Sequence, residues 1–508
     1  MAFWQGTGFL LLGGILSRLL GLYRLVLPRL LGPEGVGLYH MAYPAYALTL
    51  ALATGGLTVA ISRLVAESAA RGAHREAERI LRIATILLVG LGAAGGAALF
   101  LGAPWLAAHV ARDARAAPAI AAVAPAVLLV AAMSGLRGYF QGYQDMAPTA
   151  ISQVVEQLVR VLGIVALAFL LRPFGLKWAA AGVAGAAGLG AAAGLLLLLA
   201  LRGRRSAPRG GGYGRPTRIL LSRLVAIALP ITITGLGVPV MQILDLVIVP
   251  AALQMQGLGA GPRTGAYGIL SGYAMPLVAL PAIISGAIAV ALVPAVAAAL
   301  ARRDAQRARN LAGESLAATW RWLLPAALGL ALLGRPIVSI LFGSASAALS
   351  LIVLSPSALL FGLAQVAAAA LQGYGRTWRP LVHLAAAAAV KAALTWPLVR
   401  MFGIVGAAEA TSVAYLVWTL LNVTALRRLT GPIGTWAFMA PTLAAGGMAG
   451  VVLALGAPRS GVATLLTVAA AAAAYGLLLG FSGGFGAAER EAMGRIAQRA
   501  RSMLAGRR

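Results

Sequence analysis

The chain has 508 residues, of which 60% are hydrophobic and 11% are charged, and its formal net charge is +28. Continuous apolar runs long enough to cross a bilayer recur along its whole length, which excludes a soluble globular protein, and their lack of alternation excludes a transmembrane β-barrel. The chain has no cysteine, which excludes thiol catalysis. We therefore predict an all-α polytopic membrane protein.

We predict about fourteen transmembrane helices, and each is expected to span the hydrocarbon core of a bilayer. The first run begins without a basic segment, so we expect a retained helix rather than a cleaved signal peptide. The approximate ranges are 7–31, 38–66, 80–108, 117–141, 147–171, 177–201, 219–250, 266–300, 312–342, 348–373, 378–401, 404–426, 434–456 and 461–481.

The first helix carries three arginines, and two of them, Arg18 and Arg24, lie deep in the apolar run. Arginines within a membrane helix normally face a bundle interior or a wet cavity. Pro28 lies four residues after Arg24, so the helix is expected to bend beside that charge. We interpret this helix as lining a cavity that accepts an anion; the alternative is an internal salt bridge to Glu156 or Asp245.

The fifth helix contains Glu156 and Arg160, four residues apart with the acid first, so their side chains can pair on one helix face. Two interpretations of this cavity polar pair remain open. It holds helices together as a locally neutral pair, or Glu156 titrates or balances the arginines of the first helix.

Three further charges are predicted within the second half of the bundle: Asp245, Lys391 and Glu409. A lysine inside the membrane needs a nearby acid to keep its proton. We expect Lys391 to pair with Asp245, Glu409 or both, in a cluster that either couples transport to an ion or locks helices together.

Positive charge gathers in alternate connections between the helices and in the C-terminal tail. By the positive-inside rule, this pattern places both termini in the cytoplasm. Because these arginines lie in short loops between membrane helices, we expect contact with anionic lipid and no nucleic-acid partner. The clusters lie at residues 71–82, 202–218, 302–309, 427–428 and 490–508.

An internal repeat divides the chain near its middle. The motif Phe140-Gln141-Gly142-Tyr143 recurs as Leu371-Gln372-Gly373-Tyr374, in the same topological sense, which predicts two pseudo-symmetric six-helix lobes with a central substrate path. The expected domains are an N-terminal lobe (1–201), a cytoplasmic linker (202–218), a C-terminal lobe (219–430), two further C-terminal helices (431–482) and a basic cytoplasmic tail (483–508).

Motifs for soluble-type catalysis are missing from the sequence. There is no phosphate-binding loop with its lysine, no nucleophile elbow and no paired-carboxylate motif. The four histidines are scattered without metal-ligand spacing. We expect neither an enzyme nor a metal site, and no cofactor.

Several stretches resemble the multidrug/oligosaccharidyl-lipid/polysaccharide exporter superfamily, and in particular its lipid II flippases and the stage V sporulation protein B branch of polysaccharide biosynthesis proteins. The resemblance covers essentially the whole chain. The stretches that carry it are Ser17-Arg18, Leu20-Gly21, Arg24, Leu31–Glu67, Arg137–Val161 and Tyr273–Pro294.

This resemblance implies a monomeric flippase in the bacterial cytoplasmic membrane that moves an undecaprenyl-diphosphate-linked saccharide precursor by alternating access. It implies that Arg18 and Arg24 bind the diphosphate. Coupling to Na⁺, H⁺ or membrane potential stays open, because Lys391 stands where a neutral sodium ligand is expected. Two alternative functions are a cation-coupled multidrug exporter of the same superfamily and a membrane scaffold for cell-wall or spore enzymes.

Overall fold

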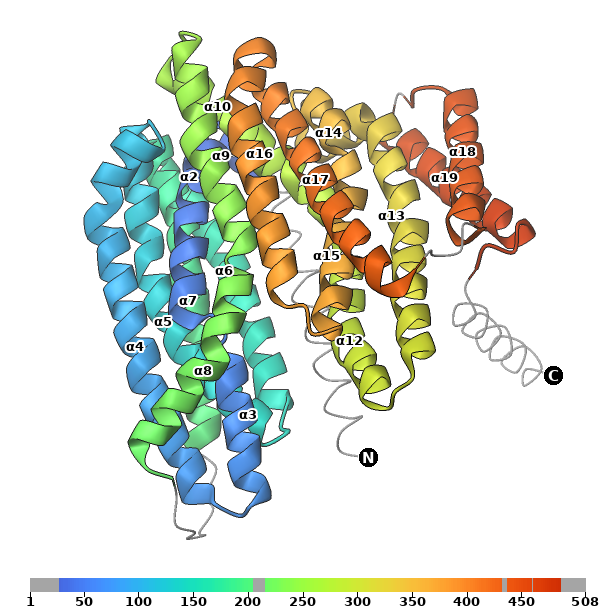
Figure 1. Cartoon of the computed structure of the whole chain (residues 1–508). Helices are drawn as coiled ribbons and strands as arrows, with labels where there is room; N and C mark the ends of the chain where they lie inside the picture. The colour runs from blue at the N-terminus through green and yellow to red at the C-terminus, as the bar shows by residue number, and fades with distance from the viewer. Residues whose placement is uncertain (1–26, 204–214, 432–435, 459, 486–508) are drawn as a thin grey trace, which may run out of the picture. The chain divides into compact units, whose positions relative to one another are not determined.

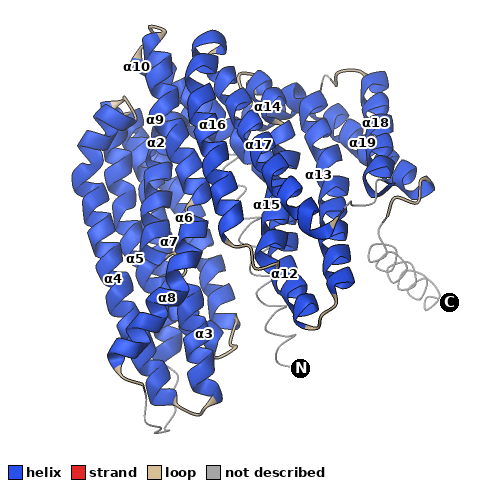
Figure 2. Ribbon diagram, in the orientation of Figure 1, coloured by secondary structure: helices blue, strands red, loops and turns tan. Residues whose placement is uncertain are grey.

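The computed structural model describes residues 27–203, 215–431, 436–458 and 460–485. Within these ranges the chain forms helices and connections without any strand (Figure 2). Thirteen helical segments of the described ranges are long and apolar enough to cross a membrane. They correspond to the second to fourteenth helices expected from the sequence, so the predicted fold class is confirmed. The first expected helix lies almost entirely outside the described residues.

The chain divides into two compact units, and the first comprises residues 1–273 together with 395–404. Its helices are α2 (Leu27–Thr54), α3 (Leu57–Ala70), α4 (His74–Trp105), η2 (Leu106–Val110), η3 (Ala114–Ala116), α5 (Ala117–Gly142), α6 (Ala147–Leu171), η4 (Arg172–Phe174), α7 (Leu176–Gly203), α8 (Thr217–Gly235), α9 (Gly237–Met255) and α10 (Ala260–Gly268).

The second unit comprises residues 274–394 and 405–508. Two segments, η5 (Ile269–Ala274) and α16 (Trp378–Phe402), run along the chain from one unit into the other, and α17 begins at the boundary. The remaining helices are α11 (Met275–Ala279), α12 (Ala282–Ala301), α13 (Ala305–Phe342), α14 (Ala348–Leu354), α15 (Pro356–Gly373), α17 (Ile404–Thr430), α18 (Trp436–Leu455) and α19 (Gly461–Phe481).

Helix α2 is the central element of the first unit. It packs against α4, α5 and α7 and also against α9 and α10, as the blue and green ribbons of Figure 1 show. Many of its apolar positions are fully buried, among them Val36, Leu38 and Met41. A helix buried on most of its circumference gives its polar side chains a protein surrounding rather than a lipid one.

The two halves of the chain repeat their local geometry around the motif that the sequence shows twice. In the first unit, Gly142 approaches α3 so closely that a Cβ atom there would lie 2.6 Å from Val65 Cβ. In the second unit, Gly373 approaches α12, and its Cβ atom would lie 2.8 Å from Val296 Cβ. A glycine thus permits the same close helix packing within each unit.

Hydrogen bonds made by side chains tie α15 to α17 in the second unit. Ser357 Oγ lies 2.9 Å from Ser412 Oγ, Thr419 Oγ1 donates to the Leu360 carbonyl at 2.7 Å, and the Asn422 amide donates to the Ala364 carbonyl at 3.2 Å. Such bonds hold helices together where lipid supplies no hydrophobic drive.

A break separates α2 from α3 at Gly55 and Gly56, against the facing surface of α8. The Gly56 N–H donates to Thr232 Oγ1 at 3.0 Å. A Cβ atom on Gly56 would lie 2.4 Å from the Ala228 carbonyl oxygen and 2.9 Å from Ala228 Cα, which are backbone atoms that cannot rotate away. The break therefore depends on a residue without a side chain.

We expect Gly56→Ala to lower the free energy of unfolding by about 1–3 kcal/mol, because the added methyl group forces α3 and α8 apart. Thermal unfolding of the purified chain in detergent measures this. Gly90→Ala is the matched control, since a Cβ atom at this α4 position meets nothing within 4 Å. Equal thermal midpoints for the two variants would contradict the packing argument.

Candidate functional site

Three charged side chains from two helices meet within the first unit. Helix α6 carries Ser152, Glu156 and Arg160 at intervals of four residues, so they share one face of the helix. Glu156 Oε1 lies 2.9 Å from Arg160 Nη2, and Glu156 Oε2 lies 2.9 Å from Nη2 of Arg137, which α5 supplies. We call Arg137, Glu156 and Arg160 the charged triad.

The charged triad is largely withdrawn from solvent. The exposed fractions of its side chains are 14% for Arg137, 13% for Glu156 and 18% for Arg160. Burying charge inside a membrane protein is unfavourable unless the charges are paired and hydrogen-bonded. One carboxylate pairs here with two guanidinium groups, so the three side chains together carry an excess of one positive charge.

Two glycines of α7 allow that helix to pack closely against the backbone of α6 beside the charged triad. A Cβ atom on Gly190 would lie 2.5 Å from the Glu156 carbonyl oxygen, and one on Gly194 would lie 3.3 Å from the Ser152 carbonyl oxygen. The four-residue spacing of these glycines is typical of tightly packed membrane helices. The α6–α7 contact therefore fixes the backbone that carries Glu156 and Arg160.

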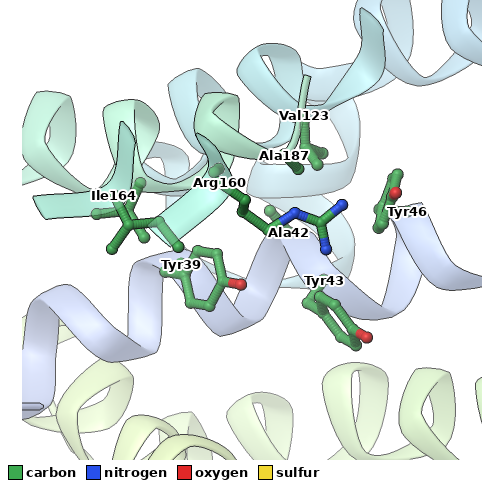
Figure 3. A pocket seen from close by; sticks show the side chains of 10 residues that line it. Tyr39, Ala42, Tyr43, Tyr46, Val123, Arg160, Ile164 and Ala187 are labelled. Atoms are coloured by element: carbon green, nitrogen blue, oxygen red, sulfur yellow. The ribbon is translucent and has the colours of Figure 1, made fainter. Parts of the chain in front are cut away.

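Arg160 also lines a pocket between α2 and the helices α5, α6 and α7. Figure 3 shows its side chain extended from α6 toward the tyrosines of α2. Tyr39, Tyr43 and Tyr46 lie at helical spacing on one face of α2 and line the same pocket. A guanidinium beside phenol groups can bind a phosphate and the hydroxyl groups of a sugar. The other lining residues are Ala42, Val123, Ile164, Val183, Ala184 and Ala187.

The ion pair between Glu156 and Arg160 that the four-residue spacing predicts is present. Arg137 and the α2 tyrosines were not identified as site residues from the sequence. Arg137 lies three residues before the repeated motif at Phe140, and an arginine within an apolar run was the available signal. The tyrosines join the site through helix packing, which spacing along one helix does not reveal.

The other predicted site residues are placed as follows. Arg18 and Arg24 lie outside the described residues. Asp245 is buried on α9 in the first unit, whereas Lys391 is buried on α16 and Glu409 lies on α17, both in the second unit. The pairing of Lys391 with an acid stays a prediction. Across the described ranges, no group of three or more metal-ligating side chains is placed to hold a metal ion.

A hydrogen-bonded cluster joins three elements at the end of the first unit where α10 lies (Figure 1). Asp113 accepts a bond of 2.7 Å from Arg115 Nη2 and one of 2.6 Å from Thr264 Oγ1 of α10. Arg115 Nη1 also lies 2.5 Å from Glu34 of α2. We call Glu34, Asp113, Arg115 and Thr264 the Asp113 cluster.

The surroundings of Asp113 favour its ionised form. Burial alone would raise the pKa of the Asp113 carboxyl, but the hydrogen bonds from Arg115 and Thr264 outweigh burial and hold that pKa below its ordinary value. The cluster is therefore intact at neutral pH and ties α2, η3 and α10 together.

A second cluster ties α3, α4 and α8 at the opposite end of the first unit (Figure 1). Glu67 lies 2.8 Å from Arg223 Nη2, and Glu76 lies 2.7 Å from Arg71 Nη2. The Arg215 backbone N–H donates to Glu76 at 2.8 Å. We call these five residues the Glu67 cluster. Glu76 is buried, whereas Glu67 and Arg223 are partly exposed. A single partly exposed pair such as Glu67–Arg223 contributes about 0–1 kcal/mol, so the network matters more than that pair alone.

The chain is similar in sequence to a known protein family and to individual known proteins. A family model described as polysaccharide biosynthesis protein matches residues 3–300. The chain is 31% identical over 441 residues to stage V sporulation protein B of Bacillus subtilis, covering 84% of each chain. It is 29% identical over 457 residues to lipid II flippase MurJ of the same organism, covering 84% of this chain and 83% of the relative.

A solved structure shows the same fold. The chain is similar to lipid II flippase MurJ in an inward closed conformation, with a TM-score of 0.70 and 15% sequence identity. The match covers 92% of this chain and 97% of that one.

The Asp113 cluster is expected to make the stability of the folded protein depend on pH. Because the pKa of Asp113 is lower in the folded protein, its stabilisation is present above the ordinary aspartate value of about 3.9 and is lost as the pH falls through the folded value. We expect Asp113→Asn to lower the thermal midpoint at pH 7, and the difference from wild type to shrink below about pH 4.

Thermal unfolding at a series of pH values in detergent measures that difference. The control is Asp304→Asn, since Asp304 accepts from the Arg307 N–H at the start of α13 and asparagine caps helices equally well. A difference between wild type and Asp113→Asn that stays constant down to pH 3 would exclude the cluster as its origin.

Proposed function

We propose that this chain, a multi-pass membrane protein that belongs to the polysaccharide biosynthesis protein family, is a flippase for an undecaprenyl-diphosphate-linked saccharide precursor. In this proposal it is a transporter of the multidrug/oligosaccharidyl-lipid/polysaccharide exporter superfamily. The observation that carries this proposal is the charged triad, whose Arg160 lines a pocket inside the first unit. The printed function of one relative, lipid II flippase, supports the same class of cargo.

The cargo chemistry fits a cationic pocket. A diphosphate with attached sugars cannot cross hydrocarbon unaided, because unsolvated charge and unpaired hydroxyl groups are strongly unfavourable there. Guanidinium groups bind phosphate oxygens through two parallel hydrogen bonds. In our proposal Arg160 supplies one such group and Arg18 and Arg24 of the first helix supply two more, while the polyprenyl tail stays in lipid.

Transport requires the two ends of the bundle to open in turn. The Asp113 cluster and the Glu67 cluster each join elements at one end of the first unit. We propose that the hydrogen bonds and ion pairs of each cluster break when cargo enters or leaves the protein on that side of the membrane, as alternating access requires. The lobes expected at residues 1–201 and 219–430 would move as alternating access requires, with no covalent chemistry.

Further parts of the proposal concern oligomeric state, membrane topology and the coupling of transport to an energy source. The protein would act as a monomer in the bacterial cytoplasmic membrane, with both termini in the cytoplasm and the arginine-rich connections on anionic lipid. Asp245, Lys391 and Glu409 are our candidates for residues that couple transport to an ion or to membrane potential.

We expect Arg160→Gln to slow translocation by tenfold or more. A hydrogen bond to a charged group contributes about 1.5–3 kcal/mol, and about 1.4 kcal/mol corresponds to a factor of ten. The measurement is the movement of a fluorescent undecaprenyl-diphosphate-linked saccharide across liposomes that contain the purified full chain. Arg172→Gln is the control, because Arg172 is exposed in η4 and belongs to neither the charged triad nor the two clusters.

An unchanged rate in Arg160→Gln would contradict the role of the pocket. Transport of an organic cation with no movement of the lipid-linked saccharide would favour a multidrug exporter instead.

The first helix gives a separate prediction. We expect the double variant Arg18→Ala, Arg24→Ala to insert and fold, because removing charge favours membrane insertion, and to lose translocation, because two guanidinium groups for the diphosphate are missing. Complementation of a flippase-deficient bacterial strain measures the loss, with surface-accessible cysteine labelling as the check on insertion. Full complementation by the double variant would show that neither arginine is needed to bind the cargo.

A further inference from the structure

The carboxylate of the charged triad has an arrangement that a simple salt bridge does not require. Its two oxygens are divided between two arginines, with Oε1 facing Arg160 and Oε2 facing Arg137, each at 2.9 Å. Either contact can therefore be broken while the other is kept. The two arginines also come from different helices, so they can move independently.

Arg137 and Arg160 differ in how firmly they are held. Arg137 Nε donates to Ser152 Oγ at 3.0 Å, and Ser152 in turn donates to the Thr149 carbonyl at 2.8 Å. Arg137 is thus fixed between Glu156 and Ser152 and does not line the pocket. Arg160 is the member of the triad that does. The arginine able to reach a ligand is the one that must leave the carboxylate.

We propose that Glu156 is a built-in competitor for the phosphate of the cargo. In the unloaded protein it occupies Arg160, and when an anionic phosphate enters the pocket, Arg160 exchanges the carboxylate for the phosphate. Arg137 keeps Glu156 neutralised during that exchange. This inference rests on the proposed function and assigns Glu156 and Arg137 as residues that set the affinity and selectivity of the phosphate site.

The physical reason lies in the balance of charges. If Arg160 were the sole partner of Glu156, binding a phosphate would leave a buried carboxylate without a counter-charge, which is strongly unfavourable. With Arg137 present, one charge-assisted hydrogen bond replaces another of the same kind. The net gain in binding free energy from this exchange is small, so cargo can be bound and also released. A neutral ligand cannot displace the carboxylate, which restricts the site to anions.

Substitution of Glu156 and substitution of Arg137 should change the affinity of the site for anions in opposite directions. We expect Glu156→Gln to bind inorganic pyrophosphate about tenfold more tightly than wild type, because the competitor is removed. We expect Arg137→Gln to bind it about tenfold more weakly, because Glu156 then retains Arg160. The double variant should bind at least as tightly as wild type, and Arg137→Lys should keep the wild-type affinity.

The measurement is calorimetric titration of the full-length chain in nanodiscs with inorganic pyrophosphate. Translocation by the same variants in liposomes gives a second readout: Glu156→Gln should lower both the half-saturating cargo concentration and the maximal rate, since release becomes slow. A merely structural pair would lower thermal stability without this split.

Weaker or unchanged pyrophosphate binding in Glu156→Gln would overturn the inference. If Arg137→Gln does not fold, the comparison of Glu156→Gln and Arg137→Lys with wild type still decides the question. The wild-type chain and Arg160→Gln separate the two proposals. Absence of translocation of the lipid-linked saccharide by the wild-type chain rejects the proposed function, whereas normal translocation by Arg160→Gln rejects the role of the pocket and with it the competitor role. Lost translocation in Arg160→Gln without tighter binding in Glu156→Gln rejects only the competitor role.

Discussion

One carboxylate shared by two guanidinium groups within the membrane is the constraint on which the site depends. Glu156 makes it possible to bury Arg137 and Arg160 together, and the remaining excess charge is directed to a pocket rather than to lipid. The close approach of α7 at Gly190 and Gly194 supports that arrangement from behind. Packing of small residues and placement of charge are therefore linked, because the backbone that carries the triad is held by the glycine contacts.

The pocket connects this constraint to the rest of the first unit through α2. The same helix carries the tyrosines that face Arg160, contributes Glu34 to the Asp113 cluster and ends at the glycines that meet α8. A movement of α2 would therefore change the pocket, the Asp113 cluster and the contact with α8 together. Such shared elements are what an alternating-access transporter needs, since cargo contact and opening must be coupled.

Much of this architecture could be predicted from the sequence, and the remainder depended on packing between helices. Hydropathy identified the membrane helices, and the spacing of Glu156 and Arg160 predicted their ion pair because both lie on one helix face. Arg137 and Tyr43 could not be assigned in the same way, since Arg137 reaches Glu156 and Tyr43 reaches the pocket from other helices. The break at Gly56 was also missed: an apolar run continues through it, and the facing Ala228 backbone shows why a glycine is needed.

The central claim is that Arg160 contacts the phosphate of a bound lipid-linked saccharide. The most direct measurement is the distance between ³¹P in the cargo diphosphate and ¹⁵N in the Arg160 guanidinium, by solid-state nuclear magnetic resonance of the loaded full chain in bilayers. The account predicts direct contact, with the nitrogen about 2.8 Å from a phosphate oxygen. Cargo that is bound and transported while its phosphorus shows no coupling to Arg160 would contradict it.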